Sequence, residues 1–233
     1  MEEKKIRWIA PNIGNDMLPV WSPAGNQIAF IRQPGNRAGE LSNLTGGVRF
    51  SVMVADAKTG KAKAIWSSPS DDGGFAQYYP NPPLAWSKSN RILFFSEHEG
   101  WNHVYSIKPD GSDLKDITPG DGIVESYCFN DDQSSIYFDG NRTDIDRRHI
   151  WSSSVTDGKP QSVTSGEGIE MYPQFTGGRL YCFRSTFDTS MTLVQYDLKK
   201  KAFNPLANQD HPSFSAKGFV KPEQVILKAA DGT

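Results

Sequence analysis

The chain has 233 residues, of which 37 % are hydrophobic and 12 % aromatic, and its formal net charge at pH 7 is −2. A near-neutral charge with interspersed signs offers no electrostatic basis for binding nucleic acid or an anionic membrane surface. No apolar run approaches the roughly 18 residues that a membrane-spanning helix requires. Neither a metal nor a cofactor is expected, because the two cysteines and four histidines lack the close spacing of metal ligands.

One segment recurs four times along the chain. It reads VWSPAGNQIAF at residues 20–30, AWSKSNRILF at 85–94, CFNDDQSSIYF at 128–138 and QFTGGRLYCF at 174–183. Each copy has an aromatic residue, then a turn of small or polar residues, then an apolar strand. The aromatic residues are 65, 43 and 46 positions apart. Periods of roughly 40–50 residues built from short strands are typical of β-propellers.

Each repeat contains the signals for a four-stranded blade. In the second repeat, apolar strands at 91–96 and 103–107 precede a Pro-Asp-Gly turn at 109–111 and a short outer strand at 114–118. The sequence therefore predicts an all-β fold, a β-propeller with four readable four-stranded blades that form a truncated part of a larger propeller. The propeller region is expected over 1–220, with repeats near 18–66, 83–118, 124–164 and 172–206.

The aromatic residue that opens each repeat is expected to be a structural anchor. An aromatic side chain at a recurring strand position packs between adjacent sheets and buries on the order of 150–250 Å². The four predicted blade anchors are Trp21, Trp86, Phe129 and Phe175. We expect core packing at these positions rather than stacking on a ligand.

Two connections are longer than the blade plan requires, at residues 33–50 and 67–82. Long loops in compact β domains are either functional or disordered, and the sequence leaves both interpretations open. Some charged or aromatic residues of the loops and hairpins are candidates to face a substrate, although exposure is the usual state of charged residues in any protein. These substrate-facing candidates are Arg37, Glu40, Glu97, Glu99 and Trp101.

The remaining reactive side chains are expected to be structural. Cys128 and Cys182 lie in apolar contexts, which favours two buried free thiols over a disulfide. The histidines are predicted to be polar residues of turns and strand edges, because no nucleophile signature accompanies them. The charges at Asp139 and at 144–148 fit no calcium loop and are predicted to form a solvated hairpin tip.

Three stretches carry a family resemblance. LPVWSPAG at residues 18–25 resembles the P-x-W-S-P-D-G repeat of two groups of propellers, the TolB-like propellers and the propeller domain of prolyl oligopeptidase-family serine peptidases. SEHEGWNHVY at 96–105 resembles a blade motif of the dipeptidyl peptidase IV-like branch of the second group. KPEQVILKAADG at 221–232 is similar to the strand that leaves the propeller in that branch. The resemblance implies that residues 221–233 are an exit strand toward a missing α/β-hydrolase domain.

The sequence assigns no catalytic residue to this chain. A serine peptidase of this type needs a G-x-S-x-G nucleophile elbow, and around Ser165 the two glycine positions hold Val163 and Glu167. The chain also lacks the Tyr-Glu-Glu motif that pairs with the substrate N-terminus in the branch that it resembles. Whether the chain acts as an enzyme therefore stays open, while the resemblance implies a serine-type parent peptidase, either a dipeptidyl peptidase or an oligopeptidase.

Two functions follow from these observations. The first is the non-catalytic propeller portion of a serine peptidase, which caps the active site and filters or positions peptide substrates that reach the missing hydrolase domain. The alternative is a stand-alone TolB-like propeller that binds a protein partner. An open arc of blades exposes apolar surface at its ends, which predicts self-association through open blade edges. A periplasmic or exported location is expected if the parent is a bacterial peptidase of this branch.

Overall fold

The computed structural model describes residues 6–35, 49–69, 84–206 and 218–230. Within these ranges, sixteen strands form four antiparallel sheets of four strands each. The predicted all-β fold with four four-stranded blades is therefore confirmed. No helix in the described ranges is long and apolar enough to cross a membrane.

Each sheet is a simple meander, because its strands are hydrogen-bonded in chain order. The first sheet contains β1 (Asn15–Trp21), β2 (Gln27–Gln33), β3 (Ser51–Asp56) and β4 (Ala62–Ser67). The second contains β5 (Leu84–Trp86), β6 (Ile92–Ser96), β7 (His103–Ile107) and β8 (Lys115–Asp116). The third contains β9 (Val124–Phe129), β10 (Ser135–Gly140), β11 (His149–Ser154) and β12 (Gln161–Ser162). The fourth contains β13 (Ile169–Thr176), β14 (Arg179–Thr186), β15 (Thr189–Asp197) and β16 (Ala202–Pro205).

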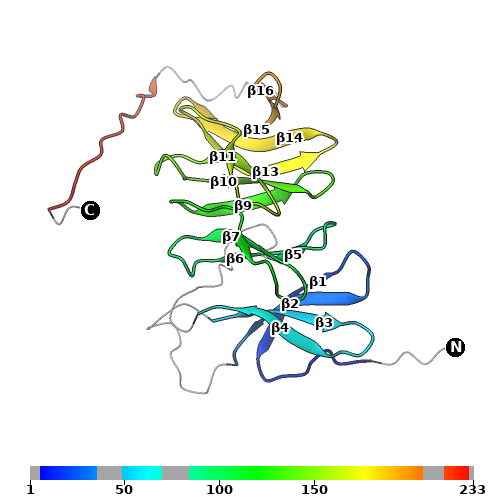
Figure 1. Ribbon diagram of the computed structural model, residues 1–233. Coiled ribbons are helices and arrows are strands. Elements are labelled where there is room, and N and C mark those ends of the chain that lie inside the picture. The colour runs from blue at the N-terminus through cyan, green and yellow to red at the C-terminus, as the bar shows by residue number, and fades with distance from the viewer. Residues whose placement is uncertain (1–5, 36–48, 70–83, 207–217, 231–233) are drawn as a thin grey trace.

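The four sheets are stacked as successive layers, from the first sheet near the N-terminus to the fourth (Figure 1). One hydrophobic cluster lies between each pair of neighbouring sheets. Strand β6 shows how a middle sheet serves two clusters, because alternate side chains of a strand point to opposite faces. Ile92 and Phe94 pack against the first sheet, whereas Leu93 and Phe95 pack against the third. Both faces of the second sheet are therefore buried.

The aromatic residues that open the repeats do not all have the same environment. Trp86 packs in the cluster shared with the first sheet, and Phe129 packs against the cluster shared with the second. The ring of Phe175 stacks on Tyr137 of the third sheet, with centroids 4.9 Å apart. Trp21 instead is 60 % exposed, contrary to the expected core packing. Its side chain faces away from the second sheet, and no further sheet follows on that side within the described chain.

Residues 218–230 differ from the expected exit strand. They are exposed along their whole length, and none of them belongs to a strand. Figure 1 shows this segment, in red, extending away from the fourth sheet. An extended segment without a neighbouring strand has no ladder of hydrogen bonds, so it is not a β-strand. That it leads toward a hydrolase domain stays a prediction.

Candidate functional site

Most of the predicted substrate-facing residues lie at one end of the sheets. This end carries the β6–β7 connection (97–102) and the β10–β11 connection (141–148), together with the segments that lead to the next sheet (117–123 and 163–168). We call this end the loop face. Arg37 and Glu40 belong to the β2–β3 connection, in a stretch that lies outside the described residues.

Hydrogen bonds join the connections of the loop face to one another. The backbone oxygen of Asn102 accepts a bond from the Val124 amide at 2.8 Å, and the Asn102 side-chain amide donates to the Val124 oxygen at 2.8 Å. The Ile123 amide donates to Oδ1 of Asn141 at 2.8 Å. The loops of the second and third sheets are therefore held side by side, and they form one surface.

The β6–β7 connection presents Glu97, Glu99 and Trp101 on this surface. All three side chains are exposed, and Trp101 is 38 % accessible. Glu99 is also anchored, because the hydroxyl of Tyr105 donates to its Oε2 at 3.0 Å. The hairpin therefore offers two carboxylates and an indole to solvent, one of the carboxylates in a defined position.

His98 lies beneath these carboxylates and packs among aromatic rings. Its ring centroid is 4.6 Å from that of Tyr105 and 5.4 Å from that of Trp66. Its Nδ1 lies 2.9 Å from Oγ of the buried Ser96. Burial lowers the pKa of His98, and the nearby Glu99 carboxylate only partly offsets this effect. A neutral, stacked imidazole at physiological pH supports the hairpin rather than acting as a cation.

Two further histidines occupy equivalent buried positions. His103 and His149 each begin the third strand of a sheet, and each places Nδ1 beside a carboxylate, Asp116 at 2.7 Å and Glu170 at 2.8 Å. Both histidines are buried and lie on inner strands of their sheets, which corrects their assignment to turns and strand edges. The signal missed in the sequence is a repeat of 46 residues, because Thr118 and Thr164 follow these histidines at the same distance. Each threonine hydroxyl accepts the backbone N–H that follows its histidine.

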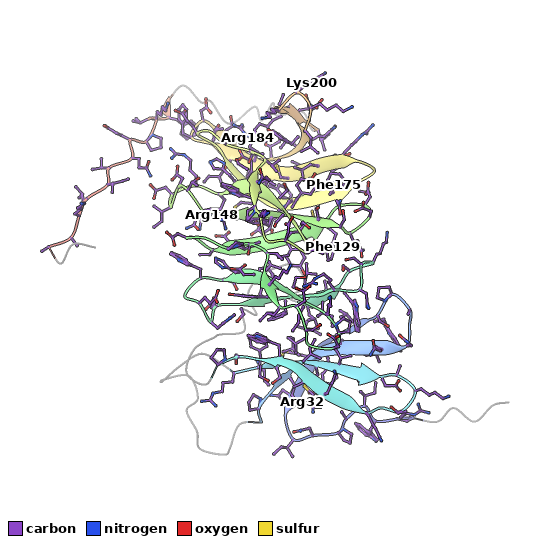
Figure 2. All side chains as sticks on the ribbon, in the orientation of Figure 1. Arg32, Phe129, Arg148, Phe175, Arg184 and Lys200 are labelled. Atoms are coloured by element: carbon purple, nitrogen blue, oxygen red, sulfur yellow. The ribbon has the colours of Figure 1, made fainter. Side chains whose placement is uncertain are left out.

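The Glu170 carboxylate joins the third and fourth sheets. It is fully buried, and besides His149 it accepts bonds from Oγ1 of Thr164 at 2.9 Å and Nε of Arg184 at 3.1 Å. The Arg184 guanidinium in turn lies over the Phe203 ring, 4.4 Å from its centroid. In Figure 2, Arg148 and Arg184 lie toward one end of the sheets, and Phe129 and Phe175 toward the other. The buried polar contact that Glu170 makes with Arg184 therefore lies toward the loop face.

Asp139 is a second buried carboxylate between these sheets. Its Oδ1 accepts bonds from the Ser126 amide at 2.7 Å and the Ser126 hydroxyl at 2.6 Å, and its Oδ2 accepts one from the Tyr172 amide at 3.1 Å. Burial raises the pKa of Asp139 to about 6. The predicted solvated hairpin tip is therefore wrong for Asp139, which bridges β9 and β13, whereas the Asp144–Arg147 pair does lie on the tip.

Residues of the C-terminal segment also contact the loop face. The Lys221 ammonium lies 2.5 Å from the Glu167 carboxylate, and Nε2 of Gln224 donates to Oδ2 of Asp146 at 2.6 Å. A cavity of about 320 Å³ lies between the segment and the loops, and Phe187 forms part of its wall. Residues 221–224 are therefore placed at the same end of the sheets as the β6–β7 connection.

The described chain shows no arrangement typical of a metal or thiol site. In these residues no group of three or more His, Cys, Asp or Glu side chains is placed to hold a metal ion. Cys128 and Cys182 are both free, and burial raises the pKa of each thiol to about 12. Both cysteines are therefore protonated, unreactive packing residues at neutral pH.

The chain resembles known proteins in sequence and in structure. A family profile for the dipeptidyl peptidase IV (DPP IV) N-terminal region matches residues 48–176. Tricorn protease homolog 1 of Streptomyces coelicolor is 34 % identical over 82 residues, which cover 34 % of this chain and 8 % of that protein. The chain thus spans a small part of the curated relative that it matches.

Three solved structures show the same arrangement of sheets. A puromycin hydrolase superimposes with a TM-score of 0.66 over 92 % of this chain and 32 % of its own, at 11 % identity. A putative dipeptidyl aminopeptidase IV from Bacteroides ovatus superimposes with a TM-score of 0.64 over 96 % of this chain and 33 % of its own, at 18 % identity. TolB from Acinetobacter baumannii superimposes with a TM-score of 0.53 over 83 % of this chain and 43 % of its own, at 16 % identity. These likenesses concern the fold, and the expected propeller resemblance to both the peptidase and the TolB groups is confirmed.

Proposed function

This chain belongs to the family of the dipeptidyl peptidase IV (DPP IV) N-terminal region, and from this premise we propose that it is the non-catalytic propeller portion of a serine peptidase. In this role it caps the active site of a hydrolase domain and filters or positions peptide substrates. The chemistry of peptide cleavage resides in the hydrolase domain, and the propeller supplies binding and exclusion.

The observation that carries the proposal is the position of residues 221–224. Contacts of Lys221 with Glu167 and of Gln224 with Asp146 hold this segment against the loop face. A domain that follows the segment is tethered at this end, next to the connection that exposes Glu97, Glu99 and Trp101. The proposed substrate-contacting residues and the proposed attachment point therefore share one face.

The loop face has the chemistry that suits an extended peptide. Carboxylates such as Glu97 and Glu99 form charge-assisted hydrogen bonds with ammonium groups and backbone N–H donors. An exposed indole such as Trp101 contacts apolar side chains and also donates one hydrogen bond. Buried apolar clusters hold the stacked sheets below together, so we expect the face to act as a wall that short peptides pass more readily than folded proteins.

The first test is the parent reading frame on both sides of the codons for residues 1–233. An in-frame continuation that encodes G-x-S-x-G, followed by Asp and His, is the expected result. A stop codon directly after Thr233 would contradict the proposal.

The second test measures peptide binding to the loop face. Fluorescently labelled peptides of increasing length are titrated against the chain and against a variant with Glu97→Gln, Glu99→Gln and Trp101→Ala. We expect a loss of binding in this variant. A matched variant at the opposite end of the third sheet, Asp157→Asn with Lys159→Gln, should bind as the unaltered chain does. Equal binding by both variants would remove the loop face from the proposed function.

The similarity to TolB supports a second candidate, a stand-alone propeller that binds a protein partner. This function predicts a stop codon after Thr233 and a stable complex with a folded protein rather than with short peptides. The reading frame and the peptide titration therefore distinguish the two functions.

A further inference from the structure

The end of the sheets opposite to the loop face is formed by short turns. In each sheet the connection between the first two strands and the connection between the last two lie at this end, which we call the turn face. Phe129 and Phe175, labelled in Figure 2, lie toward it. A sheet added to either end of the stack would leave the turn face uncovered, because this face runs along the stack. Its connections, all within the described chain, are residues 22–26, 57–61, 87–91, 108–114, 130–134, 155–160, 177–178 and 198–201.

The turn face and the loop face differ in charge. The connections of the turn face contain nine lysine and arginine residues and five aspartates, whereas the four connections that define the loop face contain three arginines and six carboxylates. The cations of the turn face are Lys58, Lys61, Lys88, Arg91, Lys108, Lys159, Lys199, Lys200 and Lys201. The formal net charge of −2 therefore conceals a separation of charge between the two faces.

The aspartates of the turn face hold the turns themselves. The Asp110 carboxylate accepts a bond from the Ser112 amide at 2.8 Å within its own turn. The Asp131 carboxylate accepts one from the Gly178 amide at 2.7 Å, which joins the turns of the third and fourth sheets. These carboxylates are directed at backbone N–H groups, and most of the lysines at this end have no carboxylate partner among the described residues.

A cavity of about 570 Å³ lies on the turn face, where the first three sheets meet. Lys63 contributes from the first sheet, Arg91 and Lys108 from the second, and Thr156 from the third. The Lys63 ammonium donates to the backbone oxygen of Asp110 at 3.0 Å. Lys63 and Lys108 are both exposed, so their ammonium groups are accessible from solvent.

Positive charge exceeds negative charge around this cavity. Three cations share the single carboxylate of Asp113, which lies 2.8 Å from Nη1 of Arg91, 3.7 Å from Nζ of Lys108 and 3.6 Å from Nζ of Lys115. Arg91 is 3 % exposed and also donates to the backbone oxygen of Asp113 at 2.6 Å, so its guanidinium is fixed in place. With Lys63 included, four cations stand against the carboxylates of Asp110 and Asp113.

We propose that the turn face binds a polypeptide segment rich in Asp and Glu, whose carboxylates enter this cavity and pair with Lys63 and Lys108. The volume falls within the roughly 300–1,000 Å³ of ligand pockets and admits more than one carboxylate side chain. Ammonium and carboxylate groups form charge-assisted hydrogen bonds. The loop face, with its excess of carboxylates, repels the same segment, so the two faces sort partners by charge.

Two features favour an acidic polypeptide over other anions. Cations continue beyond the cavity across the turns of the third and fourth sheets, at Lys159 and at 199–201, which suits an extended chain better than a small anion. Binding to a membrane surface uses inserted apolar side chains as well as cations. The turn connections contain no aromatic residue, and their exposed large apolar residues are only Leu114 and Leu198, at 41 % and 37 %.

A binding assay with a defined acidic peptide tests the proposal. Fluorescein-labelled decaglutamate is titrated with the full chain, and fluorescence anisotropy is measured at low salt and at about 150 mM salt, where attraction between exposed charges is partly screened. We expect saturable binding that weakens as salt increases. Decaserine of the same length should not bind. Absence of decaglutamate binding at low salt would overturn the proposal.

A pair of charge-matched variants locates the site. Lys63→Gln with Lys108→Gln removes two charges at the cavity, and is expected to weaken binding by about fivefold or more, because two ion pairs are lost. Lys199→Gln with Lys200→Gln removes two charges from the turn of the fourth sheet, and should weaken binding by less than about twofold. Both changes are at exposed side chains, and circular dichroism checks that each variant is folded. Equal weakening by the two variants would show general attraction to the surface and overturn the cavity as the site.

Competition identifies the class of partner. Unlabelled decaglutamate is compared with inorganic phosphate, with vesicles of an anionic phospholipid and with a single-stranded oligonucleotide, all at the same concentration of negative charge. Decaglutamate is expected to compete most strongly. Stronger competition by any of the other three would contradict an acidic polypeptide as the partner. The turn face lies opposite to residues 221–224, so these outcomes do not bear on the peptidase role proposed for the loop face.

Discussion

The interface between the first and second sheets and the interface between the third and fourth are built from different chemistry. The first is a cluster of rings, in which Trp66 lies 5.1 Å from Phe50 and 4.8 Å from Phe94 between centroids. The second also has an apolar cluster, but it contains the buried carboxylates Asp139 and Glu170 as well. The same sequence repeat therefore supports two kinds of contact between neighbouring sheets.

The difference teaches what each interface contributes. Burial of rings is favourable in many relative orientations, because the hydrophobic effect is not directional. A buried carboxylate is tolerated only when its hydrogen-bond partners are in place, and for Glu170 these are His149, Thr164 and Arg184. The interface between the first and second sheets therefore contributes mainly to the free energy of unfolding. The interface between the third and fourth sheets sets the position of the fourth sheet, and its stability depends on pH.

The largest effect is expected from a change that disrupts the cluster of aromatic rings between the first and second sheets. Phe94 is fully buried, and Phe94→Ala removes its contacts and leaves a cavity, which costs about 3–5 kcal/mol of the free energy of unfolding. Urea denaturation followed by circular dichroism measures this loss. The matched control is Phe183→Ala on the exposed face of the fourth sheet, which should lose much less. Equal losses would mean that the two rings contribute alike and would contradict the apolar interface as the main source of stability.

The second effect is the pH dependence of the interface between the third and fourth sheets. Burial raises the pKa of Asp139 to about 6, so the folded state holds this proton more tightly than the unfolded state. The stabilising contribution is therefore complete below about pH 4 and is lost as the pH rises through about 6, by up to about 3 kcal/mol. Comparison of the unfolding free energies of the unaltered chain and Asp139→Asn from acidic to neutral pH measures this slope.

The matched control for that slope is Asp144→Asn on the hairpin tip. A hydrogen bond from Arg147 lowers the pKa of Asp144, so its contribution has the opposite sign and is lost as the pH falls. A flat difference between the unaltered chain and Asp139→Asn would show that Asp139 has the same pKa in the folded and unfolded states.

A third change breaks the polar contact directly. Glu170→Gln keeps the size of the side chain but places an amide donor beside His149 and Arg184, which are donors themselves. We expect a loss of about 1.5–3 kcal/mol in thermal or urea unfolding, the range for a buried hydrogen bond to a charged group. Glu167→Gln, three residues away in an exposed ion pair, should cost less than about 1 kcal/mol. A neutral Glu170→Gln would mean that packing alone holds the fourth sheet.

The smallest effect concerns Trp21, the anchor that no sheet of the described residues covers. Trp21 is 60 % exposed, so Trp21→Ala should change stability by about 0.5 kcal/mol. Trp86→Ala is the matched variant, because Trp86 is 8 % exposed and its Nε1 donates to Oδ1 of Asn90 at 2.9 Å. It should be several times more destabilising. Similar losses at both positions would show that Trp21 is protected in solution.

The candidate site was only partly accessible from the sequence. The exposed hairpin with Glu97, Glu99 and Trp101 follows from local turn signals, and its exposure agrees with that expectation. The contact between residues 221–224 and the loop face could not be foreseen, because Gln224 and Asp146 are 78 positions apart in the chain. Whether these residues meet a substrate stays a prediction.

The sequence by itself determined the four blades, because an aromatic residue, a turn and alternating apolar residues act locally and recur in every repeat. Only the tertiary structure decided which polar residues are buried. Asp139 meets the Tyr172 amide 33 positions away, and this contact exists only once the third and fourth sheets are stacked. Trp21 and Trp86 open the same motif, yet their exposure differs, because within the described residues the first sheet packs against Trp86 and no sheet packs against Trp21. Burial depends on which residues, distant in the chain, pack against a side chain, and the local sequence pattern does not contain this information.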